Sequence, residues 1–518
     1  YTFYMDGIVK AAPPSNNKIM AYYYDEDSAL WSNNVVNLVR GTWHLFWKLF
    51  VDAICWPHDL LGSPEYDKVR KQFAKTLDGS GRYREIADCL AYTNIDADFV
   101  QRFDVACPHL IPLRNRRVYD AVLGVQRLRV ASDMFRRAME FSLIPEDDAK
   151  IEQVHAWLEE VLCPDGDVVE LMDFWRQWLG YLFSGYQSDR RFYLLTGNGS
   201  NGKGLLEQMF ALVMGKFYFK CYAHWLTAAG AKNMGAEAAT PAMMNIQYAR
   251  VAMCSEYPGY ELMDATKMKT LTSGDRQTGR HLHGEQTEFN VMCKIVIACN
   301  TLPSIGTEQA MADRAFMYRM PHRYVIHPSK PNELKKDNDK VRYITEQLRD
   351  AFGSYACYAL RDLLDGRSDV PKLGRDPALI KAHTKEFIES NNYPLMWFKK
   401  EVTSDPPPPT ARHLGEDLLT FEPVQWFIPI SGAHSHFRSW CQRNNYIAPS
   451  KMPLEDFVRA LRQLDEVVME DFDVSDLPED HRAHNYPGLR ILNAKINTDK
   501  QHPYHSDRVY NTTFVSGE

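Results

Sequence analysis

Short apolar runs alternate with helical or polar segments in the middle of the chain. From Arg191 onward the sequence contains RFYLLTG, ARVAMCSE and CKIVIACN, which are bounded by glycine, asparagine or proline residues. Apolar runs of this length, with helical segments between them, are typical of buried strands in a parallel sheet. The pattern therefore predicts an α/β core, which we assign to residues 188–345.

Helical periodicity dominates on both sides of this core. Residues 151–187 carry apolar side chains at helical spacing and are interrupted by Pro164-Asp165-Gly166, which predicts two helices joined by a turn. We expect these helices to form a collar that leads into the core. Residues 1–150 are predicted to be a mainly helical N-terminal domain, and residues 346–404 a further helical segment.

A proline run separates this part of the chain from a C-terminal module. Residues 405–410 begin with Asp405 and four prolines, a stiff sequence that cannot be helical and predicts a linker. In residues 411–518, SHFRSWCQRNNY and SKMPLEDFVRALRQL predict two short helices, and YPGLRILN is compatible with a strand. This order favours a small winged-helix-like module.

Length and composition indicate a folded protein of several domains. The chain has 518 residues, of which 45% are hydrophobic and 25% charged, and these values exclude a mostly disordered or fibrous chain. No apolar stretch approaches the roughly 18–20 residues of a membrane span, so no membrane contact is expected. The ten cysteines form no Cys-x-x-Cys pair, which favours a reducing, cytoplasmic compartment. Because the chain begins at Tyr1 without Met, we expect a fragment of a longer protein.

The net charge of −7 is unevenly distributed. Counting Lys and Arg against Asp and Glu gives −7 for residues 1–190, +5 for residues 191–380 and −5 for residues 381–518. Only the middle third is basic. This distribution favours a polyanionic partner at the predicted core.

A glycine-rich loop joins the first predicted strand to a predicted helix. Residues 197–204 fit G-x-x-x-x-G-K, a loop whose backbone N–H groups cradle phosphates while its lysine reaches the β- and γ-phosphates. The strand before the loop and the helical spacing of LLEQMFALVMG after it place phosphate at a helix N-terminus. The candidate nucleotide-binding residues are Gly197, Asn198, Gly199, Ser200, Asn201, Gly202, Lys203 and Gly204. Gly204 stands where a Ser or Thr hydroxyl usually binds Mg²⁺.

Two further predicted strands end in polar residues. ARVAMCSE ends in Ser255-Glu256, and we predict that Glu256 polarises the water that attacks the γ-phosphate and helps to hold Mg²⁺. CKIVIACN ends in Asn300, whose amide is suited to hydrogen-bond the γ-phosphate and the attacking water. Judged from local sequence alone, Glu256 is also compatible with a plain strand end and Asn300 with a turn before Leu302-Pro303.

The segment DRAFMYR supplies two candidate arginine fingers, Arg314 and Arg319. An arginine that reaches the nucleotide of a neighbouring subunit stabilises the charge of the transition state. A surface ion pair is the alternative role for each of them.

Taken together, these motifs resemble a superfamily 3 DNA helicase. GNGSNGKG, RVAMCSEYPG, KMKTLTSGDRQTGRHLH and KIVIACNTLPSI follow one another within about a hundred residues, as in the poxvirus-type primase-helicases of nucleo-cytoplasmic large DNA viruses and in related phage and plasmid primases. The resemblance covers roughly residues 105–345. The helical region upstream and the C-terminal module are similar to the domains that flank the helicase in that family.

The resemblance implies an AAA+-like P-loop ATPase core, a hexameric ring, Mg²⁺-dependent ATP hydrolysis and 3′–5′ translocation on single-stranded DNA. Carried over by position, Lys203 binds phosphate, Glu256 activates water and Asn300 is the sensor. The spacing Asp-x-Ala-x-x-x-Arg favours Arg319 over Arg314 as the finger.

The segment between the second and third motifs is rich in cations. In the resemblance, Lys269 and Arg280 lie on or near a hairpin that faces DNA in the central pore. A ring pore gathers phosphate contacts by presenting six copies of a few cations, so it does not require a basic protein. The candidate DNA-binding residues are Lys267, Lys269, Arg276, Arg280, His281 and His283.

Two departures from the family pattern keep other functions open. Gly204 lacks the expected hydroxyl, and Ser255 occupies the place where many relatives have a second acid, so both bear on how Mg²⁺ is held. A nucleotide-dependent scaffold that loads or holds DNA with little hydrolysis is therefore one alternative. A P-loop kinase that acts on a small molecule is another.

The expected partners follow from the replicative role that the resemblance implies. They are single-stranded DNA or a replication fork, further copies of the chain in a hexamer, and a viral polymerase or processivity factor. Members often carry an N-terminal primase domain, but the acidic pair Asp96-Ala97-Asp98 lacks an accompanying His motif. We therefore expect the helicase part of a viral primase-helicase, acting at a viral replication site in the host cytoplasm.

Overall fold

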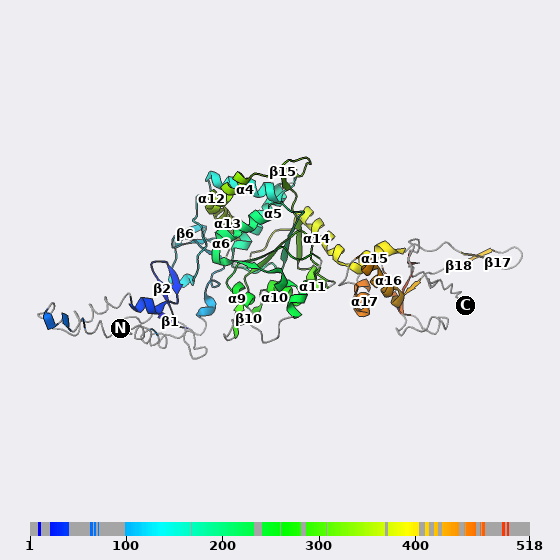
Figure 1. Cartoon of the computed structure of the whole chain (residues 1–518), viewed down its shortest axis with the longest axis horizontal. Coiled ribbons are helices and arrows are strands. Elements are labelled where there is room, and N and C mark those ends of the chain that lie inside the picture. Colours follow the sequence, from blue (N-terminus) through cyan, green and yellow to red (C-terminus); the bar gives the residue numbers. More distant parts are fainter. Residues whose placement is uncertain are drawn as a thin grey trace.

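The computed structural model describes the chain almost continuously from residue 99 to residue 403, with shorter described ranges on either side (Figure 1). The described residues are 9–11, 21–40, 63–65, 67–68, 71, 87, 99–166, 168–232, 241–259, 261–280, 286–306, 308–367, 371–403, 410–413, 419–422, 427–444, 450, 452–462, 467, 469–471, 489–492 and 495–496.

A five-stranded parallel sheet organises the middle of the molecule. Its strands lie in the order β13-β7-β12-β9-β8, and every neighbouring pair is parallel. The strands are β7 (Phe192–Thr196), β8 (Tyr218–Cys221), β9 (Val251–Ser255), β12 (Lys294–Cys299) and β13 (Ala315–Arg319). All residues of β7 and β12 are buried, as strands covered on both faces require. The predicted α/β core, with its three apolar strands, is confirmed.

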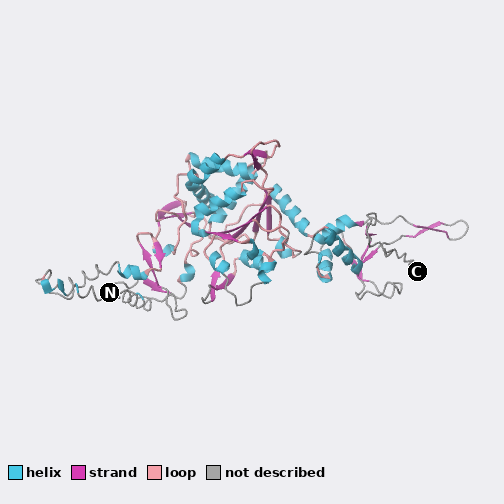
Figure 2. Ribbon diagram, in the orientation of Figure 1, coloured by secondary structure: helices cyan, strands magenta, loops and turns pink. Residues whose placement is uncertain are grey.

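Helices cover both faces of this sheet (Figure 2). Tyr193 and Leu195 pack in one hydrophobic cluster with α4, α5, α6 and α13, whereas Phe192 and Leu194 pack in a second cluster with α9 and α10. The alternation of side chains along a strand therefore divides the core into two layers. No helix among the described residues is long and apolar enough to cross a membrane. The helices are α4 (Ala149–Leu162), α5 (Val169–Phe183), α6 (Lys203–Met214), α7 (Ala223–Leu226), α8 (Ala228–Lys232), α9 (Pro241–Ile246), α10 (Ala265–Ser273), α11 (Gln309–Ala312), α12 (Asn338–Gln347), α13 (Arg349–Leu364) and α14 (Ala378–Asn391).

Helix α13 belongs to the core although it lies beyond the boundary predicted at residue 345. Its buried side chains, among them Phe352 and Leu360, are part of the cluster that covers the sheet. A Cβ added to Gly180 in α5 would lie 2.5 Å from the backbone nitrogen of Leu360, so the two helices approach to backbone contact. The predicted helical segment 346–404 is therefore divided, because α13 and α14 pack on the core whereas α15 (Tyr393–Glu401) does not.

The described part of residues 1–150 contains more strand than helix, which differs from the mainly helical domain predicted. Two antiparallel sheets are formed, and the rest of the range lies outside the described residues. The guanidinium of Arg129 is buried and donates to the carbonyl oxygens of Ala29 (3.1 Å) and Ser28 (2.8 Å), so it ties the two sheets together. Arg129 is thus an internal hydrogen-bond donor although its side chain is charged. The strands are β1 (Val9–Ala11), β2 (Ala21–Asp25), β3 (Leu30–Ser32), β4 (Leu110–Pro112), β5 (Arg117–Asp120) and β6 (Val125–Leu128).

The C-terminal elements form a separate hydrophobic cluster around Trp397, Phe437 and Phe457. Helices α15, α16 (Ile430–Arg443) and α17 (Leu454–Arg462) contribute to it. A small antiparallel sheet has the strand order β19-β21-β20, and the winged-helix assignment stays a prediction. The predicted linker prolines lie outside the described residues. The remaining strands of this part are β16 (Val402–Thr403), β17 (Thr410–His413), β18 (Leu419–Glu422), β19 (Phe427–Pro429), β20 (Met469–Asp471), β21 (Leu489–Leu492) and β22 (Lys495–Ile496).

We predict that Gly180→Ala lowers the melting temperature of the core, because the added methyl group would overlap the backbone of α13. Forcing α5 and α13 apart should cost about 1–3 kcal/mol. The matched control is Gly204→Ala in α6, where the methyl group meets no atom within 4 Å and alanine favours the helix. Thermal unfolding followed by circular dichroism measures both variants. If Gly180→Ala melted at the same temperature as Gly204→Ala, this result would contradict the close approach of α5 and α13.

Candidate functional site

The loop between β7 and α6 follows a backbone path that favours glycine. Gly199, Ser200 and Gly202 have φ angles of 82°, 49° and 89°, a region that glycine adopts without steric cost. A Cβ on Gly202 would also lie 2.9 Å from the side chain of Val161, so this position needs glycine for space as well. The loop leads directly into the first turn of α6, whose N–H groups have no partners within the helix.

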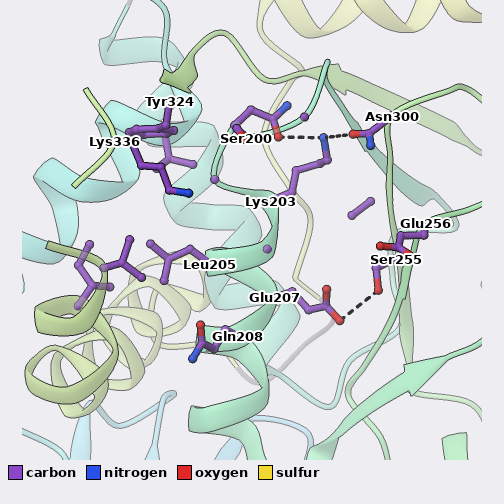
Figure 3. A pocket seen from close by; sticks show the side chains of 18 of the residues that line it. Ser200, Lys203, Leu205, Glu207, Gln208, Ser255, Glu256, Asn300, Tyr324 and Lys336 are labelled. Carbon is purple, nitrogen blue, oxygen red and sulfur yellow. Dashed lines mark hydrogen bonds between the residues drawn. The ribbon is translucent and has the colours of Figure 1, made fainter. Parts of the chain in front are cut away.

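Lys203 is the first residue of α6, and its ammonium group points into the loop (Figure 3). The residue is only 9% exposed. Its Nζ donates to the carbonyl oxygen of Gly197 (3.1 Å) and to Oδ1 of Asn201 (2.9 Å) and of Asn300 (3.2 Å). Burial lowers the pKa of Lys203, because removal from water penalises the charged form. Within the described residues Lys203 makes no ion pair with a carboxylate, so the site is suited to receive an anion.

The register of the sheet brings Asn300 to Lys203. Strand β12 pairs with β7 so that Cys299 lies opposite Thr196. Asn300 therefore leaves the sheet beside Gly197, and its amide oxygen accepts a hydrogen bond from Lys203. Asn300 thus contacts the loop, which a residue serving only as a turn former would not need to do. Its role as a sensor stays a prediction.

Glu256 follows β9 at the same edge of the sheet. Its backbone N–H donates to the carbonyl oxygen of Ala298 (3.0 Å), and its φ angle is 61°. This left-handed conformation costs a non-glycine residue about 1–2 kcal/mol, a strain that is often stored at functional sites. The exposed side chain of Glu256 lines the same cleft as Lys203 and Asn300.

These residues line an open cleft of about 1200 Å³. The loop and the ends of β9 and β12 form one side. The opposite side is formed by α4 and by the segment that contains β14 (Arg323–Val325), β15 (Glu333–Lys335) and α12, and Tyr324 and Lys336 lie there in Figure 3. The apolar residues of the cleft are concentrated on that side and include Trp157, Val161, Tyr324, Leu334, Val341 and Ile344. Lys203 thus lies on one side of the cleft, and large apolar groups lie on the other side together with Lys336; such a cleft has the chemistry to hold an aromatic base that is linked to phosphates.

Several polar groups of the cleft were not found by the sequence motifs. The Tyr324 hydroxyl donates to Oε1 of Glu160 (2.9 Å), and the Lys340 ammonium donates to Oε2 of the same carboxylate (2.6 Å). These contacts join α4 to β14 and α12, which lie on the same side of the cleft. Partners that are 164 and 180 positions apart in sequence leave no short motif to recognise.

Glu207 was also missed. It lies one turn after Lys203 on α6, lines the cleft, and accepts a hydrogen bond from Oγ of Ser255 (3.3 Å) at the end of β9 (Figure 3). The available signal was its position four residues after Lys203, on the same face of the helix. Because every helix has residue pairs at this spacing, the signal does not single out Glu207.

The two candidate arginine fingers lie at opposite ends of β13, which is an outer strand of the sheet. Arg314 directly precedes β13, and its Nη1 donates to the carbonyl oxygen of Ala310 (2.9 Å). Arg319 ends β13 opposite Thr196, at the end of the sheet that carries the loop of residues 197–204. Its half-exposed side chain forms an ion pair with Glu386 (3.1 Å). Neither arginine lines the cleft of its own chain. An arginine finger that reaches a nucleotide in this cleft would therefore have to belong to another subunit.

Two of the candidate DNA-binding lysines lie on α10 and have partners within the chain. The Lys267 side chain is 14% exposed, donates to the carbonyl oxygen of Trp225 (2.6 Å) and lies 3.5 Å from the carboxylate of Asp264. Lys269 forms an ion pair with Glu308 (2.7 Å). A DNA phosphate would have to replace these contacts, and the exposed pair of Lys269 is the easier one to exchange.

The other candidates lie on or beside an antiparallel hairpin of β10 (Arg276–Arg280) and β11 (Gln286–Asn290). The side chain of Arg276 is 71% exposed and lies 3.8 Å from Glu288. Arg280 ends β10, whereas His281 and His283 lie outside the described residues. Arg276 is therefore the candidate with the most accessible charge among those whose side chains are described.

Proteins similar to this chain are named as helicases and primases of large DNA viruses. A protein provisionally named a helicase in Acanthamoeba polyphaga mimivirus is 24% identical over 408 residues, which cover 76% of this chain and 38% of that protein. A protein provisionally named a helicase in Frog virus 3 is 31% identical over 137 residues, which cover 26% and 14%. A protein provisionally named a primase in African swine fever virus is 23% identical over 283 residues, which cover 52% and 28%. The predicted resemblance to the helicases and primases of these viruses is confirmed.

No family model matches the chain. Among solved structures, the chain is similar to the apo form of the C-terminal region of NrS-1, with a TM-score of 0.35 and 11% identity over 56% of this chain and 60% of that chain. The chain spans 38% of the mimivirus relative and smaller shares of the other two viral proteins.

We predict that Glu256→Gly is more stable than Glu256→Ala by about 1 kcal/mol, because only glycine adopts a φ angle of 61° without a steric cost. Both variants lack the carboxylate, so their difference isolates the backbone conformation. Chemical denaturation of the two proteins measures it. An alanine variant as stable as the glycine variant would contradict the strain assigned to this residue.

Proposed function

We propose that the chain is the motor region of an ATP-dependent DNA helicase, part of a viral primase-helicase, that assembles as a hexameric ring and translocates on single-stranded DNA. The observation that carries this proposal is the buried ammonium of Lys203, which lies at the N-terminus of α6 and contacts Asn300 from the neighbouring strand. A cation and a helix N-terminus at one point form a site for phosphate. The names of the viral relatives support the assignment to a helicase.

The proposed chemistry is hydrolysis of the γ-phosphate by water. The loop N–H groups and Lys203 bind the phosphates, and Asn300 holds the γ-phosphate and the attacking water in position. Glu256 accepts a proton from that water. Because phosphoryl transfer spreads negative charge over the phosphate oxygens in the transition state, the fixed cation of Lys203 lowers the barrier as well as binding the substrate.

The residues of the cleft fit the magnesium ion that accompanies ATP. Mg²⁺ prefers hard oxygen ligands and is often held by one or two carboxylates together with substrate phosphates and waters. Oxygen ligands of this kind, Ser255, Glu256 and Glu207, line the cleft near Lys203. Within the described residues no group of three or more His, Cys, Asp or Glu side chains is placed to hold a metal by itself. When bound, Mg²⁺ would shield the negative charge of the phosphates.

Arg319 is the better candidate for a finger that acts between subunits. It lies at the edge of the sheet that carries the loop, but outside the cleft of its own chain. Its partner Glu386 has a side chain that is 60% exposed, and exposed ion pairs of this kind contribute little free energy. Arg319 can therefore leave Glu386 for a phosphate of a neighbouring subunit at small cost.

The exposed hairpin is the proposed DNA contact. In a ring, Arg276 and the other cations of β10 and α10 would be repeated once per subunit, and the summed charge would track the DNA backbone without reading its sequence. This arrangement agrees with a basic middle third in a chain whose net charge is −7.

One observation favours a second candidate function, a nucleotide-dependent scaffold with little hydrolysis. Gly204 and Ser255 both lack the group that usually binds Mg²⁺ at their positions. ATP binding without phosphate release would identify this alternative.

We predict that Lys203→Ala weakens ATP binding at least 100-fold and abolishes DNA-stimulated hydrolysis, because the loop then lacks its fixed cation. The loss of charge-assisted hydrogen bonds at about 1.5–3 kcal/mol each gives this magnitude. Lys216→Ala is the matched control, since Lys216 is exposed and lies outside the cleft. Equilibrium binding of a fluorescent ATP analogue and phosphate release give the two readouts. Undiminished turnover in Lys203→Ala would refute the proposed function.

We predict that Arg319→Ala lowers the rate of hydrolysis about 1,000-fold while ATP binding stays within a few-fold of the wild type, as expected for an arginine finger. Arg314→Ala should retain hydrolysis, because Arg314 lies at the other end of β13, away from the loop of residues 197–204. Mixing the Arg319 variant with a Lys203 variant should restore part of the turnover, since some interfaces then combine an intact loop with an intact finger. Normal hydrolysis by Arg319→Ala, or no recovery on mixing, would contradict a shared active site.

A further inference from the structure

Glu207 places a carboxylate at the point where the chain lacks its expected magnesium ligands. It lies on α6 four residues after Lys203, hence on the same face of the helix, and it lines the cleft with a side chain that is 14% exposed. Figure 3 shows it below Lys203 and directed toward Ser255. None of the sequence motifs includes this residue.

The contacts of Glu207 all converge on one of its two oxygens. Oε1 accepts hydrogen bonds from the Tyr218 hydroxyl (3.0 Å) and from Oγ of Ser255 (3.3 Å), and it lies 3.1 Å from the Lys220 ammonium. Among the described residues, no hydrogen bond or ion pair joins Oε2. The carboxylate is therefore fixed in orientation through one oxygen, while the other keeps its lone pairs for a further ligand.

The hydrogen bond to Ser255 locates this carboxylate relative to the expected metal site. Ser255 stands immediately before Glu256, where a second acid would extend from the tip of β9. Its hydroxyl is bonded to Glu207 instead. At Gly204, an added Cβ would meet no atom within 4 Å, so the space of the missing hydroxyl is open. A carboxylate is thus absent from position 255 of the strand, but the helix places the carboxylate of Glu207 within hydrogen-bond distance of that position.

We infer that Glu207 is a ligand of the Mg²⁺ that accompanies ATP, directly or through one metal-bound water, and that the Glu207–Ser255 pair replaces the acid expected at position 255. This inference rests on the proposed nucleotide site and assigns a metal-binding role to a residue that the motif pattern leaves out. It explains how a loop without a hydroxyl after its lysine retains Mg²⁺. Glu207 would join Glu256 in an oxygen-rich set of the kind that Mg²⁺ prefers.

The test measures the magnesium dependence of nucleotide binding separately from binding itself. The wild-type chain and Glu207→Gln are titrated with a fluorescent non-hydrolysable ATP analogue, first in EDTA and then at increasing Mg²⁺. We expect similar affinities in EDTA and, for Glu207→Gln, at least a tenfold rise in the Mg²⁺ concentration that gives half of the metal-dependent gain in affinity. An unchanged Mg²⁺ requirement would overturn the inference.

Three further variants separate metal binding from a structural role. Tyr218→Phe removes a hydrogen bond to Glu207 but keeps the carboxylate, and it should retain the wild-type Mg²⁺ requirement. Glu152→Gln removes an exposed carboxylate of α4 that lies outside the cleft, and it should do the same. Ser255→Asp in the Glu207→Gln background returns a carboxylate to the strand and should restore at least part of the Mg²⁺ response.

The outcomes distinguish this inference from the proposed function. If the wild type fails to bind the analogue in EDTA and in Mg²⁺ alike, the nucleotide site itself is refuted. If it binds but Glu207→Gln and Tyr218→Phe shift the Mg²⁺ requirement equally, Glu207 acts by supporting the fold and the inference fails. Should Glu207→Gln not fold, Glu207→Asp provides the same readout: the shorter carboxylate should keep the EDTA affinity and raise the Mg²⁺ requirement, and an unchanged requirement would overturn the inference.

Discussion

The parallel register of β7, β12 and β9 is the constraint on which the candidate site depends. Parallel strands end at a common edge, so residues that follow them in sequence meet in space even when they lie far apart in the chain. The loop of residues 197–204 follows β7, Asn300 follows β12, and Glu256 follows β9. A slip of one residue in either pairing would turn alternate side chains to the other face and separate the three groups.

The buried ammonium of Lys203 adds an electrostatic constraint to this geometry. Burial lowers its pKa, and its acceptors are the neutral oxygens of Gly197, Asn201 and Asn300 rather than a carboxylate. A desolvated cation without a counterion is costly in the free protein. An anion bound beside Lys203 would supply the missing counterion, so the site proposed for phosphate holds its cation in place before a ligand binds.

Sequence reasoning predicted the parts of the structure that depend on local order along the chain. The apolar strands, the loop and the polar strand ends have signatures within a few residues, and the contact of Asn300 with Lys203 follows once the strands are parallel. Contacts between distant segments left no such signature. The burial of Arg129 among carbonyl groups, the inclusion of α13 in the core, and the partners of Lys267 arise from tertiary packing. The local sequence pattern shows where polar side chains occur along the chain, but it does not show whether tertiary packing supplies them with a buried hydrogen-bond partner.

The position of Glu207 has a consequence for how the site works as a unit. A second acid at the tip of β9 would belong to the same strand as Glu256. Glu207 instead shares α6 with Lys203 and contacts the sheet at three points among the described residues: Ser255 at the end of β9, and Tyr218 and Lys220 on β8. Of the two carboxylates proposed to bind the metal, Glu207 therefore belongs to the helix that carries Lys203, and Glu256 belongs to the end of a strand. The hydrogen bond between Glu207 and Ser255 thus joins the helix that carries the proposed phosphate-binding lysine to the strand whose end carries the proposed water-activating carboxylate.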